Sequence, residues 1–265
     1  MHAPSPAVSV VSVRVVYTGP VAELVLDSAP VNALTSEFLQ SWNAALDSLA
    51  GVTRSVLVRS ELPGTFMAGG DLALLDTGSP AELADYVTSL QRAFTRLAQL
   101  PVPVVCLVEG HCLGGGLELA LAADIIVATS RATFGFPEAR LGILPAAGGV
   151  HRLVRRVGEG TSRRLMLTGQ RIDAARAHQL GVVDDLVEAD GGLDHTRALA
   201  VDLAGLPNAA VTAIKQLTNT ALDRTLDEGL AAEWTQWQAI RATAETHAAL
   251  RAASERGSRK PEERP

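Results

Sequence analysis

The sequence predicts an α/β fold in which strands and helices alternate along most of the chain. Short runs rich in apolar and β-branched residues recur between amphipathic segments with helical spacing. The intervening segments have about the length that crossovers between parallel strands require. With 265 residues, of which 47% are hydrophobic and 20% charged, the chain can bury one large core.

The first part of the chain begins with β structure. Residues 8–17 and 21–26 are rich in β-branched residues and flank a Thr-Gly-Pro turn, so they predict a hairpin. A helix is expected to begin at Thr35 or Ser36 and to stop at Gly51. Residues 54–59 predict a strand, and the glycine-containing residues 62–71 predict a loop whose last residue, Asp71, caps the next helical turn.

The middle of the chain contains the strongest local signals. Ser79 and Glu82 flank Pro80 in the form of a capping box, which predicts the start of a long amphipathic helix. The apolar residues 102–108 predict a buried strand, followed by a glycine turn at Gly114 and a helix start. Further strands are expected at residues 124–128, 132–136 and 182–187, with helices at 150–156, 160–167 and 173–180.

From residue 193 onward the pattern is almost wholly helical. Leu230, Trp234 and Trp237 form one apolar stripe, which is typical of core or of a subunit interface. The sequence therefore predicts a short leader at 1–7, a core at 8–192, a helical region at 193–256 and a frayed charged tail at 257–265.

The composition excludes several classes of partner and of site. A net charge of −6, with only two lysines in the chain, argues against nucleic acid and anionic membrane as partners. The two cysteines suit neither a disulfide framework nor a zinc site, and no segment has the pattern of a secretion signal or a membrane span. We therefore expect a cytoplasmic protein without a metal site.

Two glycine-flanked loops and two carboxylates remain as candidates for chemistry. Gly114, Gly115 and Gly116 carry no Cβ, which lets backbone N–H groups approach a ligand at a helix start. Glu118 follows within the first turn of that helix, although an acid is favourable there without any catalytic role. The neighbouring His111 and Cys112 are expected to have structural roles only.

The ordered set of motifs resembles the crotonase superfamily, and within it the enoyl-CoA hydratases. The set is Ala68-Gly-Gly-Asp71, then Gly114-Gly-Gly-x-Glu-Leu-Ala120, then Phe134-Gly-x-Pro-Glu138 followed by Pro-x-x-Gly-Gly. The resemblance implies a crotonase-like spiral of repeated ββα units with a C-terminal helical trimerisation region. It also implies an acyl-CoA thioester as substrate, no cofactor, and a homotrimer or dimer of trimers.

The same resemblance implies which residues form the site. The oxyanion hole would consist of the N–H groups of Ala68 and Gly115, which stabilise charge that develops on a thioester oxygen. Glu118 and Glu138 would act as the acid–base pair around one water molecule. The expected substrate-binding positions are Met67, Gly69, Asp71 and Gly114.

The reaction implied is the addition of water to a 2-enoyl-CoA to give a 3-hydroxyacyl-CoA. A Δ3-Δ2-enoyl-CoA isomerase or another crotonase-type acyl-CoA enzyme is the alternative, but retention of both glutamates favours the hydratase. A non-catalytic acyl-CoA-binding or RNA-binding relative is the alternative of another class. The sequence departs from the family pattern at Ala146, where glycine is usual, which leaves acyl specificity open.

Overall fold

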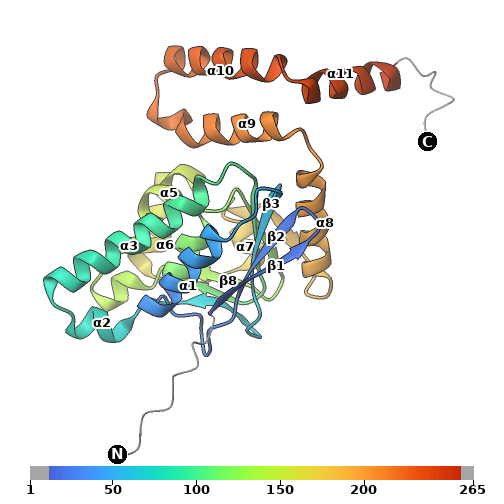
Figure 1. Cartoon of the computed structure of the whole chain (residues 1–265). Coiled ribbons are helices and arrows are strands. Elements are labelled where there is room, and N and C mark those ends of the chain that lie inside the picture. The colour runs from blue at the N-terminus through green and yellow to red at the C-terminus, as the bar shows by residue number, and fades with distance from the viewer. Residues whose placement is uncertain (1–11, 258–265) are drawn as a thin grey trace, which may run out of the picture.

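The computed structural model describes residues 12–257, which form two β-sheets with helices packed around them (Figure 1). The larger sheet has six strands, in the spatial order in which they are named here. They are β1 (Val13–Thr18), β2 (Val21–Leu26), β3 (Ser55–Ser60), β5 (Val104–Val108), β7 (Ile125–Thr129) and β10 (Asp185–Val187). The hairpin of β1 and β2 is antiparallel, and every later pair is parallel, as the helical crossovers predict.

The smaller sheet has four strands, β4 (Thr65–Ala68), β6 (His111–Leu113), β8 (Thr133–Gly135) and β9 (Ile172–Asp173). β4, β6 and β8 run parallel, and β9 is antiparallel to β8. In three successive repeats the chain places one strand in the larger sheet and the next in the smaller one, namely β3 then β4, β5 then β6, and β7 then β8. The expected loop at residues 62–71 therefore contains a strand, which was missed because four residues are too few to show a period.

Helices that follow these strands cover the sheets. They are α1 (Ser36–Asp47), α2 (Leu72–Thr77), α3 (Pro80–Ala98), α4 (Gly115–Ala120), the 3-10 helix η1 (Glu138–Leu141), α5 (Gly149–Val157), α6 (Glu159–Thr168) and α7 (Ala174–Gln179). The predicted caps are confirmed, because the Thr35 side chain accepts the Phe38 N–H and Ser79 forms a capping box with Glu82. The largest fully buried side chains of the core include Trp42, Phe66, Phe94, Phe134 and Phe136.

The opposite face of the larger sheet is covered by α8 (Gly192–Ala204). The Ser55 hydroxyl of β3 donates to the Ala200 carbonyl of α8 at 2.7 Å. Glu23 of β2 is wholly buried and accepts from Arg59 at 2.7 Å and from Arg197 of α8 at 2.6 Å. A buried carboxylate held by two guanidinium groups thus fixes α8 to the sheet.

The last helices are α9 (Asn208–Thr220), the 3-10 helix η2 (Ala221–Asp223), α10 (Leu226–Arg241) and α11 (Ala244–Gly257), and they lie beside the two sheets, with α10 and α11 extending outward (Figure 1). The apolar stripe of α10 is exposed in the single chain, with Trp234 at 58% and Trp237 at 55%. It is therefore not core in this chain.

The predicted leader lies outside the described residues, as does the predicted tail beyond residue 257. Within residues 12–257, no helix has the length and apolar character needed to cross a membrane.

Candidate active site

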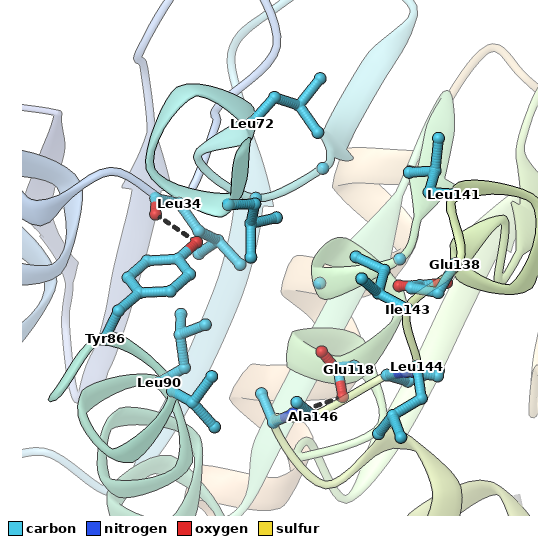
Figure 2. Close-up of a pocket in the computed structure, with 18 of the residues that line it drawn as sticks. Leu34, Leu72, Tyr86, Leu90, Glu118, Glu138, Leu141, Ile143, Leu144 and Ala146 are labelled. Atoms are coloured by element: carbon cyan, nitrogen blue, oxygen red, sulfur yellow. Dashed lines mark hydrogen bonds between the residues drawn. The ribbon is translucent and has the colours of Figure 1, made fainter. Parts of the chain in front are cut away.

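The site is built at the carboxyl ends of the three parallel strands of the smaller sheet. Gly69 and Gly70 follow β4, Gly114 and Gly115 follow β6, and Glu138 follows β8 three residues beyond its end. Because carboxyl ends of neighbouring parallel strands meet at one edge, these loops converge. All five residues line a single cavity, shown in Figure 2.

The rest of the cavity wall is almost entirely apolar. Leu72, Leu75 and Leu90 come from α2 and α3, and the segment after η1 contributes further side chains. Figure 2 shows Leu90 facing the side from which Glu118 and Leu144 project. A cavity with two carboxylates and otherwise apolar walls suits a ligand with an apolar chain and one polar reacting centre. Its lining includes Leu34, Leu72, Leu75, Val87, Leu90, Leu141, Ile143, Leu144, Pro145 and Ala146.

Glu118 lies on α4 and is 4% exposed. One of its carboxylate oxygens, Oε1, accepts the N–H groups of Ala147 at 2.7 Å and of Gly149 at 2.8 Å. Burial raises the pKa of Glu118, while these two hydrogen bonds and the positive charge of Arg152 oppose the rise. The pKa of Glu118 is therefore raised on balance, and the two N–H groups and Arg152 limit the rise.

Glu138 begins η1 and is 8% exposed. Its Oε2 atom is buried and has no hydrogen-bond partner among the described residues. Burial, followed by the negative charge of Glu118, raises the pKa of Glu138 to about 7, although its own backbone N–H opposes this. A Cβ atom on Gly114 would lie 2.6 Å from Glu138 Oε1, so the glycine turn leaves the room that this carboxyl group needs.

Four glycines line the cavity, and two of them, Gly70 and Gly115, have main-chain N–H groups without an acceptor among the described residues. Gly115 is the first residue of α4, where an N–H group has no partner within the helix. The Ala68 N–H, in contrast, donates to the Val31 carbonyl at 3.0 Å, and Ala68 does not line the cavity. The expected donor Ala68 is therefore wrong, and Gly70 is the residue of that loop with a free N–H.

The remaining predicted positions divide into two groups. Gly69 and Gly114 line the cavity. Met67 is fully buried in the core, and Asp71 caps α2 by accepting the Leu74 N–H at 3.0 Å, so neither side chain faces the cavity. The structural roles expected for the two neighbours in β6 fit their surroundings. The His111 Nδ1 lies 2.8 Å from Thr133 Oγ1, and Cys112 is a fully buried free thiol.

Sequence reasoning missed two polar side chains of α3. The Tyr86 hydroxyl is buried at the cavity wall, and the Gln91 side chain donates to the Ala146 carbonyl at 2.8 Å. Tyr86 was recognised only as one apolar position of an amphipathic helix. Its hydroxyl group was the available signal, since a buried tyrosine hydroxyl normally has a partner.

An apolar cavity that presents two carboxylates and two unpaired main-chain N–H groups defines an enzyme site suited to acid–base chemistry next to a polarised carbonyl group. The chain belongs to the enoyl-CoA hydratase/isomerase family, whose model matches residues 18–263. The two sheets and their surrounding helices are the crotonase fold that the sequence predicted.

Curated relatives and solved structures agree with this assignment. The chain is 36% identical to probable enoyl-CoA hydratase 2, mitochondrial, of Arabidopsis thaliana over 87% of this chain and 76% of the relative. It is 35% identical to methylglutaconyl-CoA hydratase, mitochondrial, of Mus musculus over 76% of this chain and 66% of the relative. An enoyl-CoA hydratase from Bacillus anthracis superposes with a TM-score of 0.88 at 28% identity, over 92% of this chain and 96% of the other. The enoyl-CoA hydratase from Polaromonas sp. JS666 gives 0.85 at 30% identity, over 94% and 98%.

Proposed function

We propose that this chain is an enoyl-CoA hydratase, which adds water across the 2,3 double bond of a 2-enoyl-CoA to give a 3-hydroxyacyl-CoA. The observation that carries the proposal is the presence of Glu118 and Glu138 in one cavity with the free N–H groups of Gly70 and Gly115. The names of the relatives, which are hydratases of acyl-CoA thioesters, support the same reaction.

In this proposal Gly70 and Gly115 bind the thioester carbonyl oxygen. Attack of water on the β-carbon moves electrons through the conjugated system, so negative charge develops on that oxygen. Two fixed N–H donors stabilise this charge, and a single donor of this kind contributes roughly 3 kcal/mol in a dry site. Gly115 adds the positive end of α4 to the interaction.

The two carboxyl groups divide the proton transfers according to their surroundings. Glu118, which accepts two N–H groups, takes a proton from water as its oxygen bonds to the β-carbon. Glu138, whose pKa is raised to about 7, gives its proton to the α-carbon. Transfer of the proton from Glu118 to Glu138 then restores both carboxyl groups. The net change is the addition of one water molecule to the substrate, so the proposed reaction needs no metal or redox cofactor.

The alternative within the family is a Δ3-Δ2-enoyl-CoA isomerase, since the family model covers both activities. An isomerase moves one proton between two carbons and can use a single carboxyl group. The two N–H groups that hold Glu118 favour the hydratase, because they orient a second carboxyl group beside Glu138 and favour its charged form.

A spectroscopic assay tests the proposal. The protein is expected to remove the ultraviolet absorbance of the conjugated thioester when it is given a short 2-enoyl-CoA. Glu118→Gln and Glu138→Gln should each reduce the rate by at least about 100-fold, because each removes one proton transfer. Glu159→Gln, on the outer helix α6 and half or more exposed, is the matched control and should keep full activity.

Two outcomes of this assay would contradict the hydratase. If a range of 2-enoyl-CoA substrates stays unchanged while a 3-enoyl-CoA is converted, the chain is an isomerase. If acyl-CoA binds without any turnover, the chain is a non-catalytic relative.

We also propose that the protein is a homotrimer or a dimer of trimers, joined in part through the exposed apolar groove between α9 and α10.

The proposed compartment is the cytoplasm. The buried thiols Cys106 and Cys112, which form no disulfide, are compatible with a reducing compartment. Several relatives carry the word mitochondrial in their names, so fractionation of cells that express the protein is the appropriate test.

A further inference from the structure

Tyr86 of α3 joins two segments of the cavity wall that are distant in sequence. Its hydroxyl donates to the Leu34 carbonyl at 2.8 Å and accepts the Asp71 N–H at 3.0 Å. The residue is only 6% exposed. Figure 2 shows the hydroxyl directed at Leu34, on the wall across the cavity from Glu118 and Glu138.

We propose that Tyr86 is a positioning residue, which holds the loop that carries the Gly70 N–H in the orientation that a thioester oxygen requires. The inference rests on the function proposed above. Asp71 directly follows Gly70, so its bond to the hydroxyl fixes the peptide on one side of the donor. The Gly70 N–H belongs to the same planar peptide group as the Gly69 carbonyl, which accepts the Leu34 N–H at 3.4 Å. Both peptide groups that meet at Gly70 are therefore anchored, and Tyr86 supplies the shorter of the two anchoring bonds.

Gly70 and Tyr86 also fit one another sterically. A Cβ atom on Gly70 would lie 2.9 Å from the Tyr86 hydroxyl oxygen but 4.0 Å from the ring carbon that bears it. The first distance is a clash and the second is an ordinary contact. The hydroxyl thus occupies the space that a side chain at position 70 would need, and it forms hydrogen bonds from that place.

The hydroxyl has no proton to give to a substrate. A tyrosine carries a single hydroxyl proton, and here the Leu34 carbonyl accepts it. Burial, with smaller contributions from the charges of Asp71 and Glu118, raises the pKa of Tyr86, although the bond from the Asp71 N–H opposes the rise. Tyr86 therefore stays protonated at neutral pH and acts through Gly70.

Tyr86→Phe removes the hydroxyl and leaves the ring in the wall. We expect kcat for a 2-enoyl-CoA to fall by roughly 10- to 100-fold, the cost of a misplaced reacting group, while KM stays unchanged. Tyr17→Phe is the matched control, because the Tyr17 hydroxyl also accepts a backbone N–H, that of Ala50 at 2.8 Å, but is remote from the cavity lining. A rise in KM at unchanged kcat would overturn the inference, since Tyr86 would then merely contact the acyl group.

A double-mutant cycle tests whether Gly70 and Tyr86 act through the same contact. Gly70→Ala alone should displace the hydroxyl and lower kcat about as much as Tyr86→Phe does. In the Tyr86→Phe background the added methyl group meets Leu75 at 3.5 Å and the ring at 4.0 Å, both ordinary contacts, so the double variant should be no slower than the slower single variant. Losses that multiply would overturn the inference.

An infrared measurement separates this inference from the proposed reaction. Hexanoyl-CoA labelled with ¹³C at the thioester carbonyl is saturated and cannot be hydrated. Its carbonyl stretching frequency should fall on binding to the wild type, and the fall should be smaller in Tyr86→Phe but unchanged in Tyr17→Phe. If wild type lowers the frequency but hydrates no 2-enoyl-CoA, the proposed function fails while the role of Tyr86 stands. An equal fall in wild type and Tyr86→Phe, or none in the wild type, would overturn the role of Tyr86.

Discussion

Glu118 and Glu138 are both buried carboxyl groups, but only Glu118 has its charge supported by main-chain donors. Oε1 of Glu118 accepts two N–H groups, whereas Oε2 of Glu138 is buried without a partner among the described residues. The same difference in surroundings separates their proposed roles, because the better-supported carboxylate acts as base and the other keeps its proton.

The raised pKa of Glu138 predicts how the rate depends on pH. Hydration needs a protonated Glu138, so kcat/KM for a 2-enoyl-CoA should fall as the pH rises through about 7. Above that pH the decline should approach tenfold per pH unit. Initial rates measured between pH 5 and pH 9 check this expectation, and a rate that stays constant across this range would refute the assignment of Glu138 as the acid.

The same shift predicts that Glu138→Gln stabilises the protein at high pH. The pKa of Glu138 in the folded state, about 7, exceeds the ordinary value of 4.5. The stability that its protonated form contributes is therefore fully present below pH 4.5 and is lost as the pH rises through about 7. The loss corresponds to about 3 kcal/mol, and glutamine, which does not ionise, avoids it. Urea unfolding at pH 5 and pH 9 should show a gain for Glu138→Gln mainly at pH 9. A gain of equal size at both pH values would show that ionisation is not its cause.

At the scale of single residues, sequence identified the two glutamates but not all of their partners. Glu118 and Glu138 lie within ordered motifs, and the structure brings both to the cavity. The choice between Ala68 and Gly70 needed coordinates, because N–H groups two residues apart in an extended chain point the same way. Only the structure shows the positive φ of Gly69, 95°, and the bond of the Ala68 N–H to the Val31 carbonyl. The hydroxyl of Tyr86 was missed because helical spacing predicts which residues are buried, and not which atom of Leu34 or Asp71 a side chain meets.

Among the helices, α9 is attached to the larger sheet through a buried ion pair. Lys215 is 7% exposed and donates to the Asp124 carboxylate at 2.7 Å and to the Val102 carbonyl at 2.9 Å. Burial lowers the pKa of Lys215 and raises that of Asp124, and each partner opposes the shift of the other. The pair therefore carries a desolvation cost, which its mutual contact and the bonds to the Val102 carbonyl and the Val104 N–H offset.

Breaking this ion pair should destabilise the packing of α9 against the larger sheet. Lys215→Ala leaves Asp124 without its cation, and we expect a loss of about 2–3 kcal/mol in the free energy of unfolding, at the low end for a buried pair because Asp124 retains some exposure. Arg163→Ala is the control, because its ion pair with Glu159 is exposed and contributes at most about 1 kcal/mol. Chemical denaturation of both variants checks the difference. Equal losses would mean that Lys215 contributes no more than a surface charge.

Helices and strands were predicted where the residues that signal them lie close together in the sequence. The caps at Thr35 and Ser79 were found because both partners lie within four residues of one another. The strands β4, β6 and β9 were not predicted, since each has only two to four residues and is paired with segments distant in sequence. The site lies at the ends of β4, β6 and β8, of which only β8 was predicted, so its loops were predicted without the sheet that aligns them.

At the scale of the whole molecule, the ordered motifs predicted the crotonase fold, but the position of the last helices was not encoded in any local pattern. The stripe of Leu230, Trp234 and Trp237 was consistent with either core or interface. In the single chain α10 packs against α9 only along part of its surface, which leaves an apolar groove open. An exposed apolar surface of this kind is characteristic of an interaction site.

The proposed trimer predicts that charge in this groove abolishes assembly. The rings of Trp234 and Trp237 stack with centroids 5.4 Å apart and are more than half exposed, so they form the centre of the open surface. Replacing both by glutamate should convert the trimer or hexamer into monomers, because two carboxylates would be buried without partners. Leu167→Glu, at a more exposed site on α6, is the control and should leave the assembly intact. Sedimentation velocity gives the mass of each species, and circular dichroism confirms that the monomers are folded. A wild-type protein that sediments as a monomer, or a double variant that still sediments as a trimer, would show that this groove does not join the subunits.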